Sequence, residues 1–452
     1  MPAVSREVLV GVDVGTTLTK AAAVTLDGAE VAHAARPTPW RAVATGAEAD
    51  PGELASTARA VALDALHRAD ARALAVGVCS MAETGVLLDS HGVAVVPSIA
   101  WHDERAGEEA ARIADLLGPE RFSVRTGLPP SRLCSLAKLR WLRTHDERAR
   151  RGVRWLGVAE WVVRSLGGDE TAELSLASRT GFLDASSRAW WSEALSFASA
   201  PPGLLPALSP AGTALGRATA EGLEGAVLAV GGHDHVCAQV GAGATRDGDV
   251  FDSCGSAEAL LAAVPPPVSD ADVAAAVRCG VTVGWHVFGG RRSLLGGFLS
   301  GLGLQRFLDL LGVGDDARAA LGEAALALPR GAGGLRVHEV TNHRARVDGI
   351  VDGLSPAHVW RAALEATQEH GAAIKLAIER IAGPTERLVV AGGWTRDAAV
   401  RGVKEEILGP FERPPVTEAG ARGAALLAGI AAGAYAGVDH LPQPSAVSEA
   451  VA

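Results

Sequence analysis

The hydrophobic positions of the first thirty residues recur at every second residue, which is the spacing of β-strands. Two such stretches, VLVGVDV (8–14) and TKAAAVTL (19–26), flank a Gly-Thr-Thr turn, and the short-hairpin signal Asp27-Gly28 follows them. This pattern predicts a three-stranded meander. The stretch VFDSCGSAEALLAAV (250–264) repeats the plan with another small-residue turn. We therefore expect the same hairpin to open each half of the chain.

Longer stretches have the amphipathic spacing of helices, and the last of them has a Ser-Pro start and a Gly stop. The predicted helices are 51–69, 103–118, 135–152 and 355–383. The predicted strands outside the hairpins are 73–80, 85–101, 225–230 and 387–393. The apolar segment 423–437 is too short to span a membrane and rich in Ala and Gly, so we expect a close-packed buried helix. The mixture predicts an α/β fold.

Length and composition narrow the function classes. A chain of 452 residues predicts two or three domains, and we expect two large lobes. The net charge of -10 is spread along the chain without a basic aromatic cluster, which argues against nucleic acid as a partner. Five scattered cysteines suggest neither a disulfide framework nor a zinc knuckle, and the N-terminus lacks a signal-peptide pattern. A reducing cytoplasm fits best.

Three glycine-containing turns carry candidate phosphate chemistry. In GVDVGTTLTK (11–20) the turn of Gly15, Thr16 and Thr17 presents backbone N–H groups and hydroxyls, and Asp13 beside it suits Mg²⁺. A plain hairpin turn is the alternative for this stretch alone. The second turn contains Gly255 and Ser256. The third, Gly392 and Gly393, lies between a predicted strand and a helix start. Neither a P-loop nor a dinucleotide-binding fingerprint is present.

The segment GGHDH (231–235) places the carboxylate of Asp234 between two imidazoles. A metal site is one interpretation, because His233 and His235 would share a side of an extended segment. A third ligand at useful spacing is missing. The other interpretation is that Asp234 is a general base, since phosphoryl transfer needs a well-placed base more than a strong one. The imidazoles would then bond sugar hydroxyls, Asp234 or the backbone.

Seven segments in register make the chain resemble the FGGY carbohydrate kinases. They are VGVDVGTTLTKAAAVTLDG, AWHDERA, LASRTGFLDASSRAWWSEAL, GGHDH, DSCGSAEA, VVAGGWTRD and GARGAALLAG. The resemblance covers nearly the whole chain. It implies the fold of actin, hexokinase and the large heat-shock chaperones, in which two ribonuclease-H-like lobes enclose Mg-ATP in a deep cleft. The implied domains are an N-terminal lobe (1–243), a C-terminal lobe (244–438) and a flexible tail (439–452).

The resemblance also implies roles for individual residues. Asp234 falls on the general base and Asp13 on the magnesium-associated carboxylate. The implied substrate-binding residues are Glu83, Trp101, Asp103, Arg105, His233 and His235. The implied ATP- and phosphate-binding residues are Gly15, Thr16, Thr17, Lys20, Gly255, Ser256, Gly392, Gly393 and Trp394. Two alternatives remain open: Asp103 and Arg105 could support the following helix, and Trp394 could either pack on adenine or fill a gap between the lobes.

The implied activity is ATP-dependent, Mg²⁺-assisted phosphorylation of a small sugar, ketose or polyol, with a pentulose such as xylulose preferred. The usual Gln and following basic residue of the substrate segment are absent from CSMAETG (79–85), which removes the easiest clue to glycerol or xylulose. VHEVTNHRARVDG (337–349) also departs from the family, so lid contacts could differ. The competing functions are an inactive sugar or nucleotide sensor and a chaperone-like switch. The expected partners are the sugar substrate, with no nucleic acid and no membrane, and a homodimer is left open.

Overall fold

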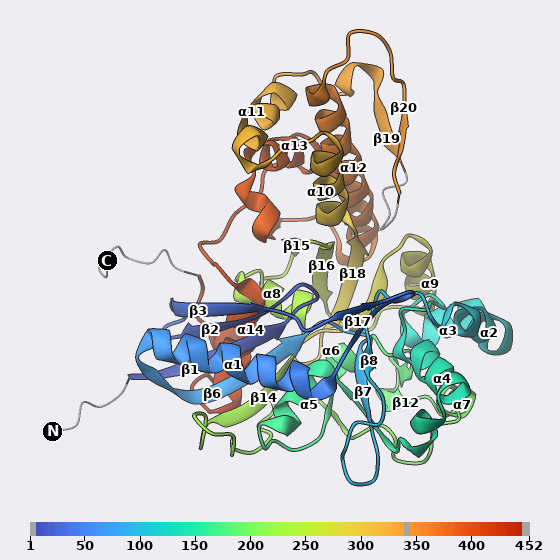
Figure 1. Ribbon diagram of the computed structural model, residues 1–452, viewed down its shortest axis with the longest axis vertical. Helices are drawn as coiled ribbons and strands as arrows, with labels where there is room; N and C mark the ends of the chain where they lie inside the picture. The colour runs from blue at the N-terminus through green and yellow to red at the C-terminus, as the bar shows by residue number, and fades with distance from the viewer. Residues whose placement is uncertain (1–5, 339–343, 445–452) are drawn as a thin grey trace.

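The computed structural model describes residues 6–338 and 344–444, and its chain forms two sheet-based lobes (Figure 1). The sheet of the first lobe has the order β14-β6-β1-β2-β3, in which β1, β2 and β3 are antiparallel neighbours and β6 and β14 run parallel to β1. Its strands are β1 (Arg6–Val14), β2 (Leu18–Val24), β3 (Glu30–Pro37), β6 (Ala71–Ser80) and β14 (Val227–His233). The predicted N-terminal meander is therefore confirmed.

The sheet of the second lobe repeats this plan. Its order is β17-β18-β16-β15-β21, with β15 and β16 forming an antiparallel hairpin and β21 returning parallel to β15. Its strands are β15 (Asp249–Cys254), β16 (Glu258–Val264), β17 (Thr282–Trp285), β18 (Arg292–Phe298) and β21 (Arg387–Ala391). The same hairpin thus opens both halves of the chain, as the sequence predicts.

The long helices begin and end at their sequence signals. In α1 (Pro51–Ala69) the Asp50 side chain accepts hydrogen bonds from the amides of Gly52 and Glu53, and Asp70 ends the helix in the left-handed conformation. The second lobe carries α12 (Pro356–Ala382), which follows Ser355 and ends at Gly383. Its other helices are α9 (Asp270–Arg278), α10 (Ser300–Leu310), α11 (Asp315–Leu326) and α13 (Ala398–Leu408).

The segment between β6 and β14 forms an addition to the first lobe with its own core. Phe122, Leu136, Trp155 and Trp191 lie in that core. Its helices are α2 (Gly107–Leu117), α3 (Pro119–Thr126), α4 (Ser135–His145), α5 (Val158–Ser165), α6 (Leu174–Ala177) and α7 (Ser192–Phe197). Of the predicted strand region 85–101, only β7 (Gly85–Leu88) and β8 (Ser98–Ile99) are strands, because a turn at Asp89–Gly92 interrupts it.

The remaining strands are short. They are β4 (Arg41–Val43), β5 (Gly46–Ala49), β9 (Arg154–Gly157), β10 (Ala172–Glu173), β11 (Leu183–Asp184), β12 (Ala189–Trp190), β13 (Leu208–Ser209), β19 (Arg336–His338) and β20 (Arg346–Asp348). The predicted lid segment 337–349 falls on β19 and β20, and its residues 339–343 lie outside the described residues. Among the residues that are described, none of the helices is both long enough and apolar enough to cross a membrane.

Two helices fill the space between the lobes, namely α8 (Asp234–Gly241) and α14 (Ala419–Ala431). Alternate residues of β1 point to opposite faces of the first sheet and belong to two separate cores. α1 covers one of these faces and α14 covers the other. The implied C-terminal lobe 244–438 is therefore wrong in one respect, since α14 packs against the N-terminal sheet. Small residues permit this approach: a methyl group on Gly423 would overlap the Cys237 carbonyl oxygen, and one on Gly11 that of Ala421.

The first part of the predicted flexible tail is packed. Leu441 is buried, and the carbonyl oxygen of Pro442 accepts a hydrogen bond of 3.0 Å from Arg422, a buried residue of α14. Residues 439–444 are therefore held by the helix that returns to the first sheet. The rest of the predicted tail, 445–452, lies outside the described residues.

We expect the substitution Gly423→Ala to lower the free energy of unfolding by about 3 kcal/mol, because the added methyl group would meet a backbone carbonyl that no side-chain rotation can move. Urea unfolding measures this change as a lower transition midpoint. Gly107→Ala is the matched control, since Gly107 is an exposed helix residue with open space at its Cβ position. Equal midpoints for the two variants would contradict the close-packing argument.

Candidate functional site

A cavity of about 540 Å³ lies between the lobes. From the first lobe it is lined by Thr16, Glu83, Trp101, Arg179, His233, Asp234 and His235, and from the second by Ala257, Glu258, Thr282, Phe298 and His370, among others. Thr16 of the first predicted phosphate hairpin thus shares one cleft with the predicted base and most of the predicted acceptor-binding residues. The other predicted phosphate and ATP residues, and Asp13, are not among the residues that line it.

Asp234 lies where strand β14 passes directly into helix α8. His233 is the N-cap residue, so the segment is not extended beyond it, and the predicted arrangement of two imidazoles on one side of a strand is wrong. The rings of His233 and His235 instead meet edge to face, with centroids 5.6 Å apart. Within 6–338 and 344–444 no group of three or more His, Cys, Asp or Glu side chains could hold a metal ion.

The electrostatics of this corner suit a carboxylate that exchanges a proton near neutrality. Burial raises the pKa of Asp234 to about 7, although the amide of His235, which donates to its Oδ1 at 2.7 Å, opposes the shift. Burial lowers the pKa of His235 to about 4 and that of His233 well below its ordinary value. Both imidazoles are therefore neutral, and His233 Nε2 lies 3.2 Å from Asp234 Oδ1.

Asp13 is a second carboxylate, near enough to Asp234 to feel its charge. Burial, followed by the charge of Asp234, raises its pKa to about 7. Its Oδ1 atom is buried without a hydrogen-bond partner in the described part of the chain. An unpartnered carboxylate oxygen beside Gly15 of the first predicted phosphate turn suits a hard cation such as Mg²⁺, which usually reaches proteins through one or two carboxylates.

The first predicted phosphate turn is supported by two indole groups. The indole of Trp101 donates to Thr16 Oγ1 at 2.8 Å, and that of Trp40 donates to the Thr16 carbonyl oxygen at 2.7 Å. Thr17 is exposed. Lys20 lies opposite Asp13 in the strand register and pairs with Glu418 at 2.8 Å, so the segment before α14 reaches this turn.

The second and third turns lie against each other in the second lobe. Gly392 has φ 124°, and a methyl group there would overlap the carbonyl oxygen of Cys254, which precedes Gly255. Ser256 accepts a 3.0 Å hydrogen bond at its carbonyl oxygen from the amide of Leu302 in α10. Gly393 has open space at its Cβ position. The predicted ATP-binding turns are thus brought to one wall.

Trp394 belongs to the second lobe. Its indole lies under the guanidinium of Arg318, which is 4.3 Å from the ring centroid, and beside Gly301 at the start of α10. Arg318 also pairs with Asp397 at 2.6 Å. These contacts lie within the second lobe, and both predicted roles of Trp394, packing on adenine and filling a gap between the lobes, stay predictions.

The predicted substrate-binding residues divide into two groups. Glu83, Trp101, His233 and His235 line the cleft, whereas Asp103 and Arg105 are absent from its lining. The Asp103 side chain is fully buried and accepts from Arg105 Nη2 at 2.8 Å, and Arg105 also pairs with Glu48 at 2.5 Å. They do not cap α2 either, because that helix starts after Ala106 without a side-chain cap. Their network fixes the loop that carries Trp101.

Sequence reasoning assigned no role to Arg179, although LASRTGFLDASSRAWWSEAL contains it. Its Nε donates to Glu83 Oε1 at 2.7 Å, and its Nη1 donates to Thr282 Oγ1 at 2.7 Å. No local pattern identifies this contact, because Glu83 precedes Arg179 by 96 positions.

Sequence reasoning also missed three buried charged residues beneath the second predicted phosphate turn. Lys404 of α13 pairs with Asp252 and, at 2.7 Å, with Glu258, and the three side chains are 1%, 0% and 0% exposed. Ser300 at the start of α10 donates to Glu258. The trio therefore ties both strands of the hairpin to two helices. The available signal was the charge of Lys404 within an otherwise buried face of its helix, next to Val400 and Val403.

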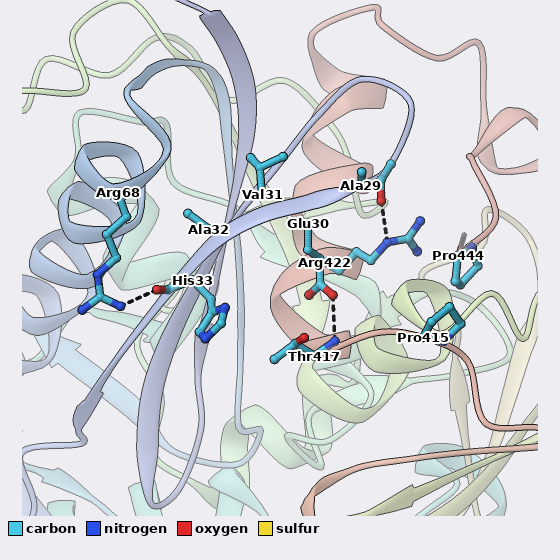
Figure 2. Close-up of a pocket in the computed structure, with 11 residues that line it drawn as sticks. Ala29, Glu30, Val31, Ala32, His33, Arg68, Pro415, Thr417, Arg422 and Pro444 are labelled. Carbon is cyan, nitrogen blue, oxygen red and sulfur yellow. Dashed lines mark hydrogen bonds between the residues drawn. The ribbon is translucent and has the colours of Figure 1, made fainter. Parts of the chain in front are cut away.

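A second cavity, of about 410 Å³, is lined by residues of the turn after β2, of β3 and of the segment before α14 (Figure 2), and Asp234 is not among its lining residues. Its polar groups already have partners: Glu30 accepts from the amides of Thr417 and Glu418, Arg422 donates to the Gly28 carbonyl oxygen, and Arg68 donates to that of His33. These contacts hold the segment before α14 against the first sheet.

The model of the N-terminal domain of the FGGY family of carbohydrate kinases matches residues 8–241. The glycerol kinase of Aromatoleum aromaticum is 30% identical, over 96% of this chain and 92% of its own length.

Two solved structures share the arrangement of both lobes. The xylulose kinase from Rhodospirillum rubrum superposes with a TM-score of 0.85 at 27% identity, covering 98% of this chain and 94% of its own. The Plasmodium falciparum glycerol kinase with ADP superposes with a TM-score of 0.84 at 18% identity over the same shares, a likeness of fold.

We expect Lys404→Met to cost about 3–5 kcal/mol of unfolding free energy near neutral pH, because it leaves two buried carboxylates without their cation. Burial and the charge of Glu258 already raise the pKa of Asp252 to about 7, and Lys404 opposes that rise. Without Lys404 the folded carboxyls bind protons more readily than the unfolded ones. The variant's stability should therefore fall as pH rises from the unfolded carboxyl range through neutrality.

Urea unfolding at about pH 5.5 and about pH 8 tests this sign, since the deficit relative to the unsubstituted chain should be smaller at the lower pH. The control is Arg361→Met, which removes the cation from the buried Glu365 of α12 and from the exposed Glu406 of α13. A deficit for Lys404→Met that does not change with pH would refute the role given to its charge.

Proposed function

This chain belongs to the FGGY family of carbohydrate kinases, and we propose that its acceptor is a neutral ketose or polyol, with a pentulose such as xylulose as the first candidate. Family members are sugar kinases, which are phosphotransferases with an alcohol group as acceptor, and ATP is their phosphate donor. The predicted fold, two lobes of the actin-type ATPase, is confirmed by the solved relatives.

The observation that carries the catalytic proposal is the partly buried carboxylate of Asp234, which lines the cleft and whose pKa is raised to about 7 by desolvation. We propose that it accepts the proton of the attacking hydroxyl. The transition state of phosphoryl transfer is loose, so the hydroxyl keeps its proton until late and a carboxylate suffices if it is held in place. The direct passage from β14 into α8 and the hydrogen bond from the His235 amide hold it.

For the cation we propose Asp13, whose buried Oδ1 lacks a partner among the described residues. Bound Mg²⁺ would supply positive charge that neutralises the phosphate oxygens. Asp13 would hold the cation next to the acceptor. The cation would in turn favour the charged form of Asp13, which burial disfavours at neutral pH.

We assign the phosphates to the three turns. Gly15, Thr16, Thr17 and Lys20 would contact them from the first lobe and Gly255 and Ser256 from the second, while Gly392, Gly393 and Trp394 would lie by the adenosine. Backbone amides of tight turns and helix starts bind anions through neutral N–H groups, so no charged side chain has to be buried. The support for this assignment is that the last two turns touch each other and that Thr16 lines the cleft.

The choice of a neutral acceptor rests on charge. Arg179, the guanidinium that influences Asp234, is already paired with Glu83, so the pair offers hydrogen bonds without a net charge. The adjacent imidazoles are neutral as well. Hydroxyl groups match such surroundings better than a carboxylate or phosphate would. Trp101 and the two imidazoles would complete the contacts to the sugar.

We expect ADP release from Mg-ATP to be stimulated by one or more neutral ketoses or polyols in a panel of pentuloses, hexuloses, aldoses, polyols and sugar acids. Xylulose is expected to give the highest kcat/KM. If glycerol were the preferred substrate, the acceptor would still be neutral, but the choice of a pentulose would be wrong. Stimulation by sugar acids alone would contradict the charge argument, and the absence of any stimulation would favour a sensor.

We expect Asp234→Asn to lower kcat by roughly 10²- to 10⁴-fold, because the amide cannot accept the hydroxyl proton. The measurement is acceptor-dependent ADP release beside the melting temperature. Asp64→Asn, a surface change on α1, is the control for loss of one carboxylate. Full activity in Asp234→Asn would remove it from the catalytic role.

The acid limb of the pH profile should report the same group. Protonated Asp234 cannot act as a base, so kcat/KM for the acceptor should rise about tenfold per pH unit up to the pKa of about 7 that burial gives Asp234, and then level off. Mg²⁺ beside Asp13 would move the limb to lower pH by favouring the charged carboxylate. A profile that is flat, or that rises only on the alkaline side, would be inconsistent with this base.

A further inference from the structure

The second lobe touches the acceptor side of the first along strand β17. The amide of Val283 donates to the Gly127 carbonyl oxygen, and the amide of Trp285 donates to Ser178 Oγ, each at 2.9 Å. The indole of Trp285 donates to the Ala185 carbonyl oxygen at the same distance. These contacts define a seam, the row of bonds between Thr282–Trp285 and the first lobe.

One bond of the seam differs from the others. Arg179 Nη1 donates to Thr282 Oγ1 at 2.7 Å, side chain to side chain, and both residues line the cleft. The Thr282 hydroxyl in turn donates to the Leu295 carbonyl oxygen at 2.8 Å, so its orientation is fixed. The cleft-facing end of the seam therefore depends on the guanidinium of Arg179.

The other side of the same guanidinium holds Glu83. Its Nε and Nη2 both contact Oε1, each at 2.7 Å, and Oε2 takes no part in this pair. Glu83 has φ 62°, a left-handed conformation that a residue with a side chain rarely adopts. Ser135 Oγ donates to the Glu83 carbonyl oxygen at 3.0 Å and supports that conformation. The carboxylate is thus held at the cleft with one oxygen left for an acceptor hydroxyl.

We propose that Arg179 is a positioning residue that couples binding of the acceptor at Glu83 to the placement of the second lobe through Thr282. The guanidinium is a rigid planar fork, so its bonds to Glu83 and Thr282 cannot be reoriented independently. An acceptor that fixes Glu83 also fixes the cleft-facing end of the seam, and closure then depends on the acceptor. This inference rests on the proposed function, because it takes Glu83 as an acceptor contact.

The test uses Thr282→Val in the full-length chain, which removes the bond across the lobes and leaves the Glu83–Arg179 pair intact. We expect the acceptor KM to rise roughly tenfold, as for loss of a hydrogen bond to a charged group. The KM for ATP and kcat should stay within about twofold. The ratio of sugar phosphate formed to ADP released should fall, since a poorly closed cleft admits water to the phosphate. Thr282→Ser, which keeps the hydroxyl, should restore all of these values.

Ser178→Ala is the matched control, because it removes a seam bond that has no link to Glu83. We expect it to lower the melting temperature and to leave the acceptor KM unchanged. An unchanged acceptor KM in Thr282→Val, or an equal rise in Ser178→Ala, would overturn the coupling alone. An unsubstituted chain without acceptor-dependent ADP release would overturn the proposed function, and the inference with it.

Discussion

The contact of α14 with α8 and the first sheet is the constraint on which the rest of the structure depends. It is made by backbone against backbone, at Gly11 in β1, Gly241 in α8 and Gly423 in α14, where any side chain would overlap a carbonyl group. Because α8 starts with Asp234 and α14 follows Glu418, this contact brings a strand end and two helix starts together. Asp13, Lys20 and the cleft acquire their geometry from it.

Burial then determines the chemistry of the charged groups. Asp13 and Asp234 lie close enough together for the charge of Asp234 to raise the pKa of Asp13, after burial itself. The imidazoles beside them are kept neutral by the same burial. In the second lobe the cost of burying Asp252 and Glu258 is offset by Lys404, which sits beneath the turn assigned to phosphate. Burial thus raises the pKa values of Asp13 and Asp234, whereas Lys404 balances the charges of Asp252 and Glu258.

Much of the fold is determined by local sequence patterns, and for that reason it was predictable from the sequence. The meander follows from period-two spacing around Gly15, and α1 and α12 follow from their caps at Asp50 and Ser355. The residues of the candidate site were predictable from the segments that resemble the FGGY kinases, and the roles of these residues remain predictions.

The rest depends on contacts between distant positions. Asp103 and Arg105 have the residue types of a sugar site, but a partner at Glu48 draws Arg105 away from the cleft. The start of α8 lacks a side-chain cap, so no signal distinguishes His233-Asp234-His235 from the end of a strand. The pairing of Lys404 with Asp252 spans 152 positions. The return of α14 to the first lobe has a consequence for dissection of the protein: a fragment ending at residue 243 would leave the face around Leu9, Ala22 and Ala75 uncovered, so the lobes are not separable by a single cut.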